Sequence, residues 1–181
     1  MRRVMIIGQP GSGKSTLARR MGAITKLPVI HIDHIHWKPG WVERPGPEKD
    51  RLCAEVHARD AWIFEGGHSA TWPERLSRAD TLIWLDLSLR RRAVRVAART
   101  LRHWGRVRPD LPAGCPEQFS VEFYSFIWRT RHSARARMAA LYETTPPGTA
   151  KHRLSSPAAV RRYLEDLSRA AASGNLGIPH R

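Results

Sequence analysis

The stretch that most constrains this chain is GQPGSGKST, residues 8 to 16, because it satisfies the pattern G-x-x-x-x-G-K-[ST]. An apolar run, RVMII at 3 to 7, precedes it, and Leu17, Met21 and Ile24 follow at helical spacing. Glycines in such a loop let backbone N–H groups point at a phosphate beside the positive end of the next helix. The alternative is a glycine-rich turn without function. The order strand, loop, helix favours a nucleotide-binding loop instead.

Within this phosphate loop each residue type has an expected task. Lys14 is long enough to reach the β- and γ-phosphates of ATP, where we expect it to act in catalysis, and the hydroxyl of Ser15 suits Mg²⁺. The residues expected to bind ATP here are Gly8, Gly11, Ser12, Gly13, Lys14, Ser15 and Thr16.

Apolar runs and helical patterns alternate along the rest of the chain. Further strands are predicted at 28–32, 61–65, 81–87 and 151–155, and helices at 47–59, 88–103, roughly 117–143 and 157–171. Strands separated by helices predict an α/β fold with a parallel sheet. We expect one domain over residues 1–171 and a flexible tail at 172–181.

The predicted helix at 88–103 begins after Ser88, a plausible N-cap, and combines apolar residues with arginines. Its packing face is expected to hold Leu89, Val94, Val96 and Leu101. Eight arginines and no carboxylate lie between residues 87 and 109. We therefore expect this surface to be neutralised by a bound anion or to remain self-repelling.

The composition points to an anionic partner. The 31 Lys and Arg residues against 16 Asp and Glu give a formal net charge of +15, and only five of the 31 are lysine. Arginine suits the paired oxygens of phosphates, although a GC-rich genome would produce the same bias. Cys53 and Cys115 fit neither a disulfide framework nor a zinc site, and no run is long enough for a signal sequence or a membrane span. A cytoplasmic protein is expected.

Several segments resemble the adenylate-kinase-like P-loop kinases, and most closely the bacterial proteins called DNA topology modulation proteins, over roughly residues 1–165. The matching segments are GQPGSGKST, HIDHIHWKPGW, WIFEGGHS, TLIWLDL, RPDLPAGCPE and LSSPAAVRRYL. The resemblance implies a three-layer P-loop NTPase sandwich with a five-stranded parallel sheet in the order 2-3-1-4-5. Helices would cover both faces, and an arginine-rich lid would lie at about 104–116.

The resemblance also implies roles for arginines. Arg95 would stack on the adenine of ATP, and Arg99, four residues later on the same helix face, would contact the transferred phosphate. After the lid, Arg129 and Arg131 would move toward the γ-phosphate. The alternative is a solvated arginine face.

Two further parts of the site follow from the resemblance alone. Adenylate kinases carry Asp-Gly at the end of the third strand, where the Asp holds Mg²⁺ through water. Here Glu65 takes that position and Asp86, at the end of the next strand, is the competitor. Ser156 and Pro157 match the stretch that packs beside adenine.

The stretch HIDHIH, residues 31 to 36, is rich in residue types that bind metals, but no fourth ligand is spaced as known His-rich sites require, so a metal site is not favoured. Asp33 follows strand two at the edge of the sheet where ligands bind. It looks like the acidic residue with which shikimate and gluconate kinases hold or deprotonate the acceptor hydroxyl. His31 is interpreted as a strand histidine with a satisfied hydrogen bond, whereas His34, His36, Trp37 and His68 are candidates for the acceptor pocket.

The prediction is an ATP- and Mg²⁺-dependent kinase that phosphorylates a small molecule, as a monomer or homodimer. Asp33 favours a nucleoside or another hydroxyl acceptor and the arginines favour a nucleotide, so the acceptor stays open. The alternative is a nucleic-acid-associated ATPase or ATP-binding regulator, which is not favoured because no helix-turn-helix, zinc finger or stacking platform is evident.

Overall fold

The computed structural model describes residues 1–174, which form a central sheet of five parallel strands in the order β2-β5-β1-β6-β7. The strands are β1 (Arg3–Gly8), β2 (Val29–His31), β5 (Trp62–Glu65), β6 (Thr81–Leu85) and β7 (Ala150–Leu154). Counted along the chain, this order is 2-3-1-4-5. The predicted α/β fold with its parallel sheet is therefore confirmed.

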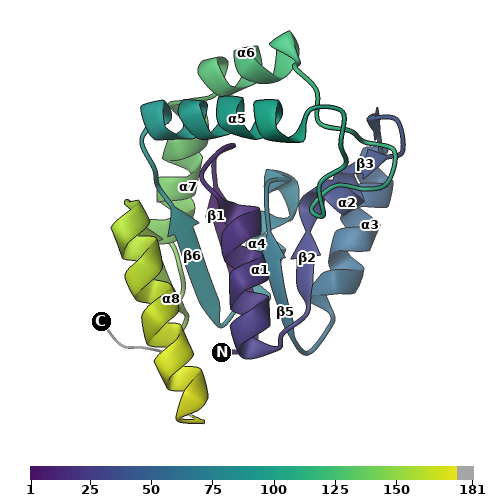
Figure 1. Ribbon diagram of the computed structural model, residues 1–181. Helices are drawn as coiled ribbons and strands as arrows, with labels where there is room; N and C mark the ends of the chain where they lie inside the picture. Colours follow the sequence, from purple (N-terminus) through teal and green to yellow (C-terminus); the bar gives the residue numbers. More distant parts are fainter. Residues whose placement is uncertain (175–181) are drawn as a thin grey trace.

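Eight helices of four or more residues surround this sheet within the described residues. They are α1 (Lys14–Thr25), α2 (Ile32–His36), α3 (Gly46–His57), α4 (Trp72–Arg78), α5 (Leu89–His103), α6 (Val121–Arg129), α7 (Ser133–Glu143) and α8 (Pro157–Ala172). Figure 1 shows α1 and α8 in front of the sheet, and α5 with α6 across its upper edge. The predicted tail begins inside α8 at Ala172, and residues 175–181 lie outside the described part of the chain.

Alternation along β1 builds the three layers. Val4 and Ile6 pack into a core cluster with residues of α1 and α8, whereas Met5 and Ile7 pack into the other cluster, which includes residues of α3, α4 and α7. Successive side chains of a strand point to opposite faces, so a continuous apolar run supplies both cores. The phosphate loop follows β1 directly and is held at the carboxyl edge of the sheet.

The packing face of α5 differs from the prediction. Val96 is buried, but Val94 and Leu101 are 68% and 78% exposed. The buried face is Arg92, Val96 and Thr100 at four-residue spacing. The reason is what α5 covers: it lies on the polar backbone of the phosphate loop, and Arg92 donates hydrogen bonds to the carbonyls of Leu87 and Pro10.

The single helix predicted at roughly 117–143 is two helices, α6 and α7. Ser120 caps α6 by accepting a hydrogen bond from the backbone N–H of Phe123. At the other end the hydroxyl of Thr130 donates to the carbonyl of Phe126, and Gln9 of the phosphate loop donates to the carbonyl of Arg131. The carbonyl of Phe126 also accepts the backbone N–H of Thr130, and the carbonyl of Arg131 is satisfied by the side chain of Gln9, which lets one helix end and the next begin.

Shorter elements were not predicted. β2 ends at His31, and the stretch from Ile32 to His36 forms the helical turn α2 instead of a loop. A two-stranded antiparallel hairpin, β3 (Trp37–Lys38) with β4 (Val42–Glu43), follows it. Neither cysteine forms a disulfide, and among the described residues no helix has the length and apolar content to cross a membrane.

Candidate active site

Gly11 and Gly13 have backbone torsions that the phosphate loop requires. Their φ angles are 78° and 95°, in the left-handed region that side chains disfavour. A Cβ on Gly11 would come within 2.5 Å of the carbonyl oxygen of Arg92, so α5 touches the loop at this point. Gly13 also forms the N-cap of α1 without a side-chain cap, which leaves the first N–H groups of α1 to bind an anion.

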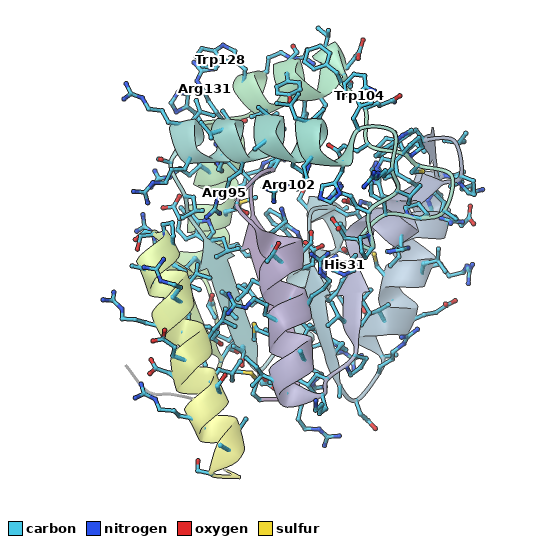
Figure 2. The ribbon with its side chains drawn as sticks, viewed as in Figure 1. His31, Arg95, Arg102, Trp104, Trp128 and Arg131 are labelled. Atoms are coloured by element: carbon cyan, nitrogen blue, oxygen red, sulfur yellow. The ribbon has the colours of Figure 1, made fainter. Side chains whose placement is uncertain are left out.

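Other groups in and around the phosphate loop are also placed to bind an anion. The hydroxyl of Ser12 is buried and has no hydrogen-bond partner among the described residues. Nζ of Lys14 lies 3.5 Å from the carbonyl oxygen of Gln9, a long contact that a phosphate can replace. Arg95 donates from Nη1 to the carbonyl of Ser12 at 3.1 Å. Arg95 and Arg102 lie on the side of α5 that faces this loop (Figure 2).

A cleft of about 1460 Å³ opens above the carboxyl edge of the sheet and includes the phosphate loop. One side is lined by Arg95, Pro157 and Arg161. The other is lined by Asp33, Trp37 and several residues between Glu65 and Trp72. Most of the predicted site residues therefore meet in one cavity: Gly8, Gly11, Ser12, Gly13, Lys14, Ser15, Thr16, Asp33, Glu65, Arg95, Arg99 and Pro157.

Asp33 lies in the first turn of α2, just past the end of β2, as predicted. Burial raises the pKa of its carboxyl to about 6, and the nearby Glu65 adds to the rise while Lys14 and Arg108 oppose it. A carboxylate with such a pKa can exchange a proton near neutral pH.

Glu65 and His31 form a buried pair at the ends of β5 and β2. Nδ1 of His31 lies 2.8 Å from Oε1 of Glu65, and a carboxylate oxygen can only accept, so Nδ1 carries the proton. The two side chains are 8% and 3% exposed. The interpretation of His31 as a satisfied strand histidine is therefore confirmed, and its partner is Glu65.

Asp86 does not line the cleft. It accepts two hydrogen bonds from Arg135 of α7 and two from Arg153 of β7. Burial alone would raise the pKa of Asp86, but the bonds from the two arginines outweigh it and hold this pKa below its usual range. The structure thus places Glu65, and not its competitor, beside the phosphate loop.

The remaining histidines of the HIDHIH stretch diverge. His34 is exposed and contacts the carbonyl of Pro109, whereas His36 lies against Trp37 and near Glu43. Among residues 1–174, no three His, Cys, Asp or Glu side chains are grouped so that they could hold a metal ion.

A carboxylate that the sequence reasoning overlooked organises the segment between α5 and α6, residues 104–120, which we call the lid segment. Glu117 is 4% exposed and accepts hydrogen bonds from Arg99, Arg108 and Thr100 at 3.1, 2.7 and 3.0 Å. Asp110 is equally buried and pairs with Arg108 and Arg19. Internal carboxylates therefore neutralise part of the arginine-rich surface, an outcome that the prediction did not consider. The signal available in the sequence was that Asp110 and Glu117 follow closely after the arginine-rich residues 87–109.

The lid segment is also bound to the β3–β4 hairpin. Gly40 donates a backbone hydrogen bond to Gly114, and Nε1 of Trp41 donates to the carbonyl of Pro116. Cys115 contacts the carbonyl of Lys38. The lid segment thus closes over the half of the cleft that contains Asp33.

Two predicted residues, Arg129 and Ser156, are placed differently from expectation. Arg129 is exposed at the end of α6 and does not line the cleft; Arg137 of α7, which the sequence reasoning missed, does. Ser156 caps α8 by accepting from the N–H of Ala159 at 3.1 Å. Its neighbour Pro157 lines the cleft.

The Gly66–Gly67 turn after β5 forms the floor of the cleft near Asp33. A Cβ on Gly66 would lie 2.0 Å from Cγ2 of Ile32, so only glycine lets the turn approach α2. Arg75, fully buried with its guanidinium 3.8 Å from the centre of the Phe64 ring, donates to the carbonyl of Gly66. Burial lowers the pKa of Arg75 to about 10, and the guanidinium still keeps its charge at neutral pH.

Comparison with known sequences gives partial matches. No family model matches the chain. Cytidylate kinases of Pyrobaculum neutrophilum and Pyrobaculum aerophilum are 34% and 32% identical over 110 and 111 residues. Each match covers 53% of this chain and 59% of the relative, so the chain spans less than two thirds of the length of these relatives.

Comparison with solved structures covers nearly the whole chain. Shikimate kinase from Acinetobacter baumannii, in complex with shikimate, superposes with a TM-score of 0.54 at 16% identity, over 98% of this chain and 96% of that one. Shikimate kinase from Bacteroides thetaiotaomicron reaches 0.55 at 19% identity, over 94% and 98%. A gluconokinase from Sinorhizobium meliloti 1021 reaches 0.51 at 16%, over 95% and 94%. At such identities these likenesses establish the shared fold.

Proposed function

We propose that this chain is an ATP-dependent phosphotransferase that moves the γ-phosphate of Mg-ATP to a hydroxyl of a small molecule. One observation carries the proposal: the phosphate loop with Lys14 and the carboxylate of Asp33 open into the same cleft. The matched relatives are named cytidylate kinases, and the structural neighbours shikimate kinase and gluconokinase, which supports the same reaction class. We infer a cytoplasmic enzyme, and the resemblance to DNA topology modulation proteins remains a prediction.

The nucleotide is assigned to the half of the cleft beside α1 and α5. The loop glycines, the unpartnered hydroxyl of Ser12 and Lys14 fit the β- and γ-phosphates, and Arg95 with Pro157 fits the adenosine. Ser15 and Glu65 both line the cleft and suit Mg²⁺, which would supply charge neutralisation on the phosphates when bound. Ser156 contributes by holding the first turn of α8 in place.

The transfer step assigns a role to Asp33. An oxygen of the acceptor hydroxyl forms a bond to the γ-phosphorus while the bond from that phosphorus to the β–γ bridging oxygen breaks. ADP leaves with the electron pair, and the hydroxyl proton passes to the carboxylate of Asp33. A carboxyl whose pKa is about 6 is ionised at neutral pH and can accept this proton.

Charge on the transferred phosphate requires cations in addition to Lys14. Arg99 lines the cleft but is bound to Glu117, and Arg137 lines the cleft on α7. We propose Arg137 and Arg99 for this task, as clamps that stabilise the transition state. Arg129 would have to move from its exposed position to take part, so its predicted role is the weaker one.

The experiment that tests this function is ATP consumption by the purified protein with Mg²⁺ across nucleosides, nucleoside monophosphates, sugars and hydroxy acids. We expect one compound to stimulate ADP formation and to appear phosphorylated in equal amount. ATP hydrolysis that no compound alters would contradict a kinase.

A nucleic-acid-associated ATPase is the second candidate, and one observation favours it. Trp128 is 59% exposed and lies near Arg131, whereas Trp104 is 61% exposed at the other end of the α5–α6 pair (Figure 2). Exposed aromatic rings among arginines are the combination that binds single-stranded nucleic acid. Stimulation by single-stranded DNA alone, lost at high salt, would support this candidate over the first.

A further inference from the structure

Within the described residues, the arginines that reach the acceptor half of the cleft from α1 and the lid segment are already paired with carboxylates. Arg19 and Arg108, which line this half, are bound to Asp110, and Arg108 is also bound to Glu117. Both carboxylates are 4% exposed, so drawing Arg108 toward an acceptor phosphate would weaken the neutralisation of two buried carboxylates at once. These arginines are therefore committed to the lid segment.

The other basic groups near Asp33 are unavailable for related reasons. Burial and the charge of Lys49 lower the pKa of His36, which keeps its ring neutral, and Lys49 itself bonds to Glu43 at 2.6 Å. His68 lies 2.6 Å from Asp50. By contrast, Arg95, Arg102 and Arg161, on the nucleotide half, have no carboxylate partner among residues 1–174.

Aromatic rings supply the contact surface on the acceptor half. Trp37 and Trp41 pack edge to face at 5.4 Å between ring centroids, and both line the cleft. Trp41 and His68 have φ angles of 61° and 60°, a strained backbone for residues with large side chains. Such strain is kept where surrounding contacts and function hold a side chain in place. Flat apolar surfaces of this kind suit a sugar ring or a planar base.

We propose that the phosphate acceptor is an uncharged hydroxyl compound with a ring, of the nucleoside or sugar class, and not a nucleoside monophosphate. The proposal rests on the kinase function proposed above. The carboxylate of Asp33, which has no ion-pair partner in the described part of the chain, would repel an acceptor phosphate and accept a hydrogen bond from a hydroxyl. Arg95, Arg102 and Arg161 would bind ATP, and Arg137 would bind the transferred phosphate.

Binding measurements on pairs of compounds, one uncharged and one anionic, test the proposed acceptor class without requiring turnover. Tryptophan fluorescence or calorimetry would compare cytidine with cytidine monophosphate, adenosine with adenosine monophosphate, and glucose with gluconate, in the presence of a non-hydrolysable ATP analogue and Mg²⁺. We expect at least one uncharged member to bind ten times more tightly than its anionic partner. Tighter binding of the anionic member in every pair, or no binding of any uncharged compound to protein that holds the analogue, would overturn the proposal. Protein that does not bind the analogue would instead reject the kinase function itself.

A pair of variants tests whether Glu117 is what keeps the arginines of the lid region from binding an acceptor phosphate. Glu117→Gln should release Arg99 and leave Arg108 with Asp110 as its one remaining carboxylate partner among the described residues, so the affinity for the monophosphate should rise at least fivefold relative to its nucleoside. Glu122→Gln is the control, because Glu122 also lines the cleft and bonds to Ser120, but pairs with no arginine among the described residues. An equal rise in both variants would show that removing any negative charge suffices and would contradict sequestration of the arginines. Thermal melting of both variants would confirm that they are folded.

Discussion

His31 donates a hydrogen bond from Nδ1 to Oε1 of Glu65 across 2.8 Å, from the end of β2 to the end of the neighbouring β5. The bond orients a buried carboxylate at the edge of the sheet where the phosphate loop lies. Asp86, at the end of β6, instead is held by two arginines outside the cleft. These two acidic residues should therefore respond differently to substitution.

We expect Glu65→Gln to raise the Mg²⁺ concentration needed for half-maximal ATP turnover at least about tenfold, because it replaces the carboxylate that we propose as a Mg²⁺ ligand. Asp86→Asn should leave that concentration unchanged and lower the free energy of unfolding by about 1–2 kcal/mol, because it weakens hydrogen bonds to half-exposed arginines. Magnesium titrations and denaturant unfolding of both variants make the comparison. A larger Mg²⁺ effect in Asp86→Asn would reverse the assignment.

Asp33→Asn should lower kcat/KM for the acceptor about 10²-fold or more while the affinity for ATP is nearly kept, since only the proton acceptor is removed. In the unmodified protein, kcat/KM should rise with pH through about 6, because the carboxylate is the active form and its pKa is raised to about 6. The variant should lack this rise. A variant with equal turnover would remove Asp33 from the mechanism.

The raised pKa of Asp33 also predicts how stability depends on pH. In the folded protein this carboxyl holds its proton up to about pH 6, against an ordinary value of 3.8, so folding binds a proton between these limits. The contribution of this group to stability is full below about pH 4 and is lost as pH rises through 6. Asp33→Asn should therefore stabilise the protein more at pH 7.5 than at pH 4, measured by thermal melting. An equal shift at both pH values would contradict the raised pKa.

Gly11→Ala should abolish ATP binding and destabilise the fold, because the new Cβ would meet the carbonyl oxygen of Arg92 at 2.5 Å. Gly148→Ala is a matched control, since Gly148 also has a positive φ, of 92°, but has open space around it. The control should cost only the backbone strain, about 1–2 kcal/mol, whereas overpacking should add about 1–3 kcal/mol at Gly11. Chemical denaturation of both variants would measure the difference. Equal losses would mean that α5 does not rest on the loop.

Local patterns were enough to predict the parallel sheet, the phosphate loop and the place of Asp33, because the carboxyl ends of parallel strands share one edge. The assignments of Glu65, Arg95, Arg99 and Pro157 came from the resemblance to a family. Strand order came from the resemblance to a family, since no local pattern encodes which strands are neighbours.

The parts that were missed depend on contacts between distant segments. The prediction of which face α5 buries was wrong. Arg92 bonds to the phosphate loop and Thr100 bonds to Glu117, and these bonds outweigh the cost of exposing Val94 and Leu101. The break before α7 depends on Gln9 reaching the carbonyl of Arg131, 122 positions away in the chain. Arg137 could not be distinguished from its neighbouring arginines until the direction of α7 was known.

The most direct test of the account follows the γ-phosphate itself. The protein would be incubated with ATP labelled at the γ-phosphate, Mg²⁺ and the acceptor panel, beside Lys14→Ala and Asp33→Asn. We expect label on one hydroxyl compound in equal amount to the ADP formed, with strong loss in both variants. Label that appears only as inorganic phosphate, at a rate that no acceptor changes, would contradict it.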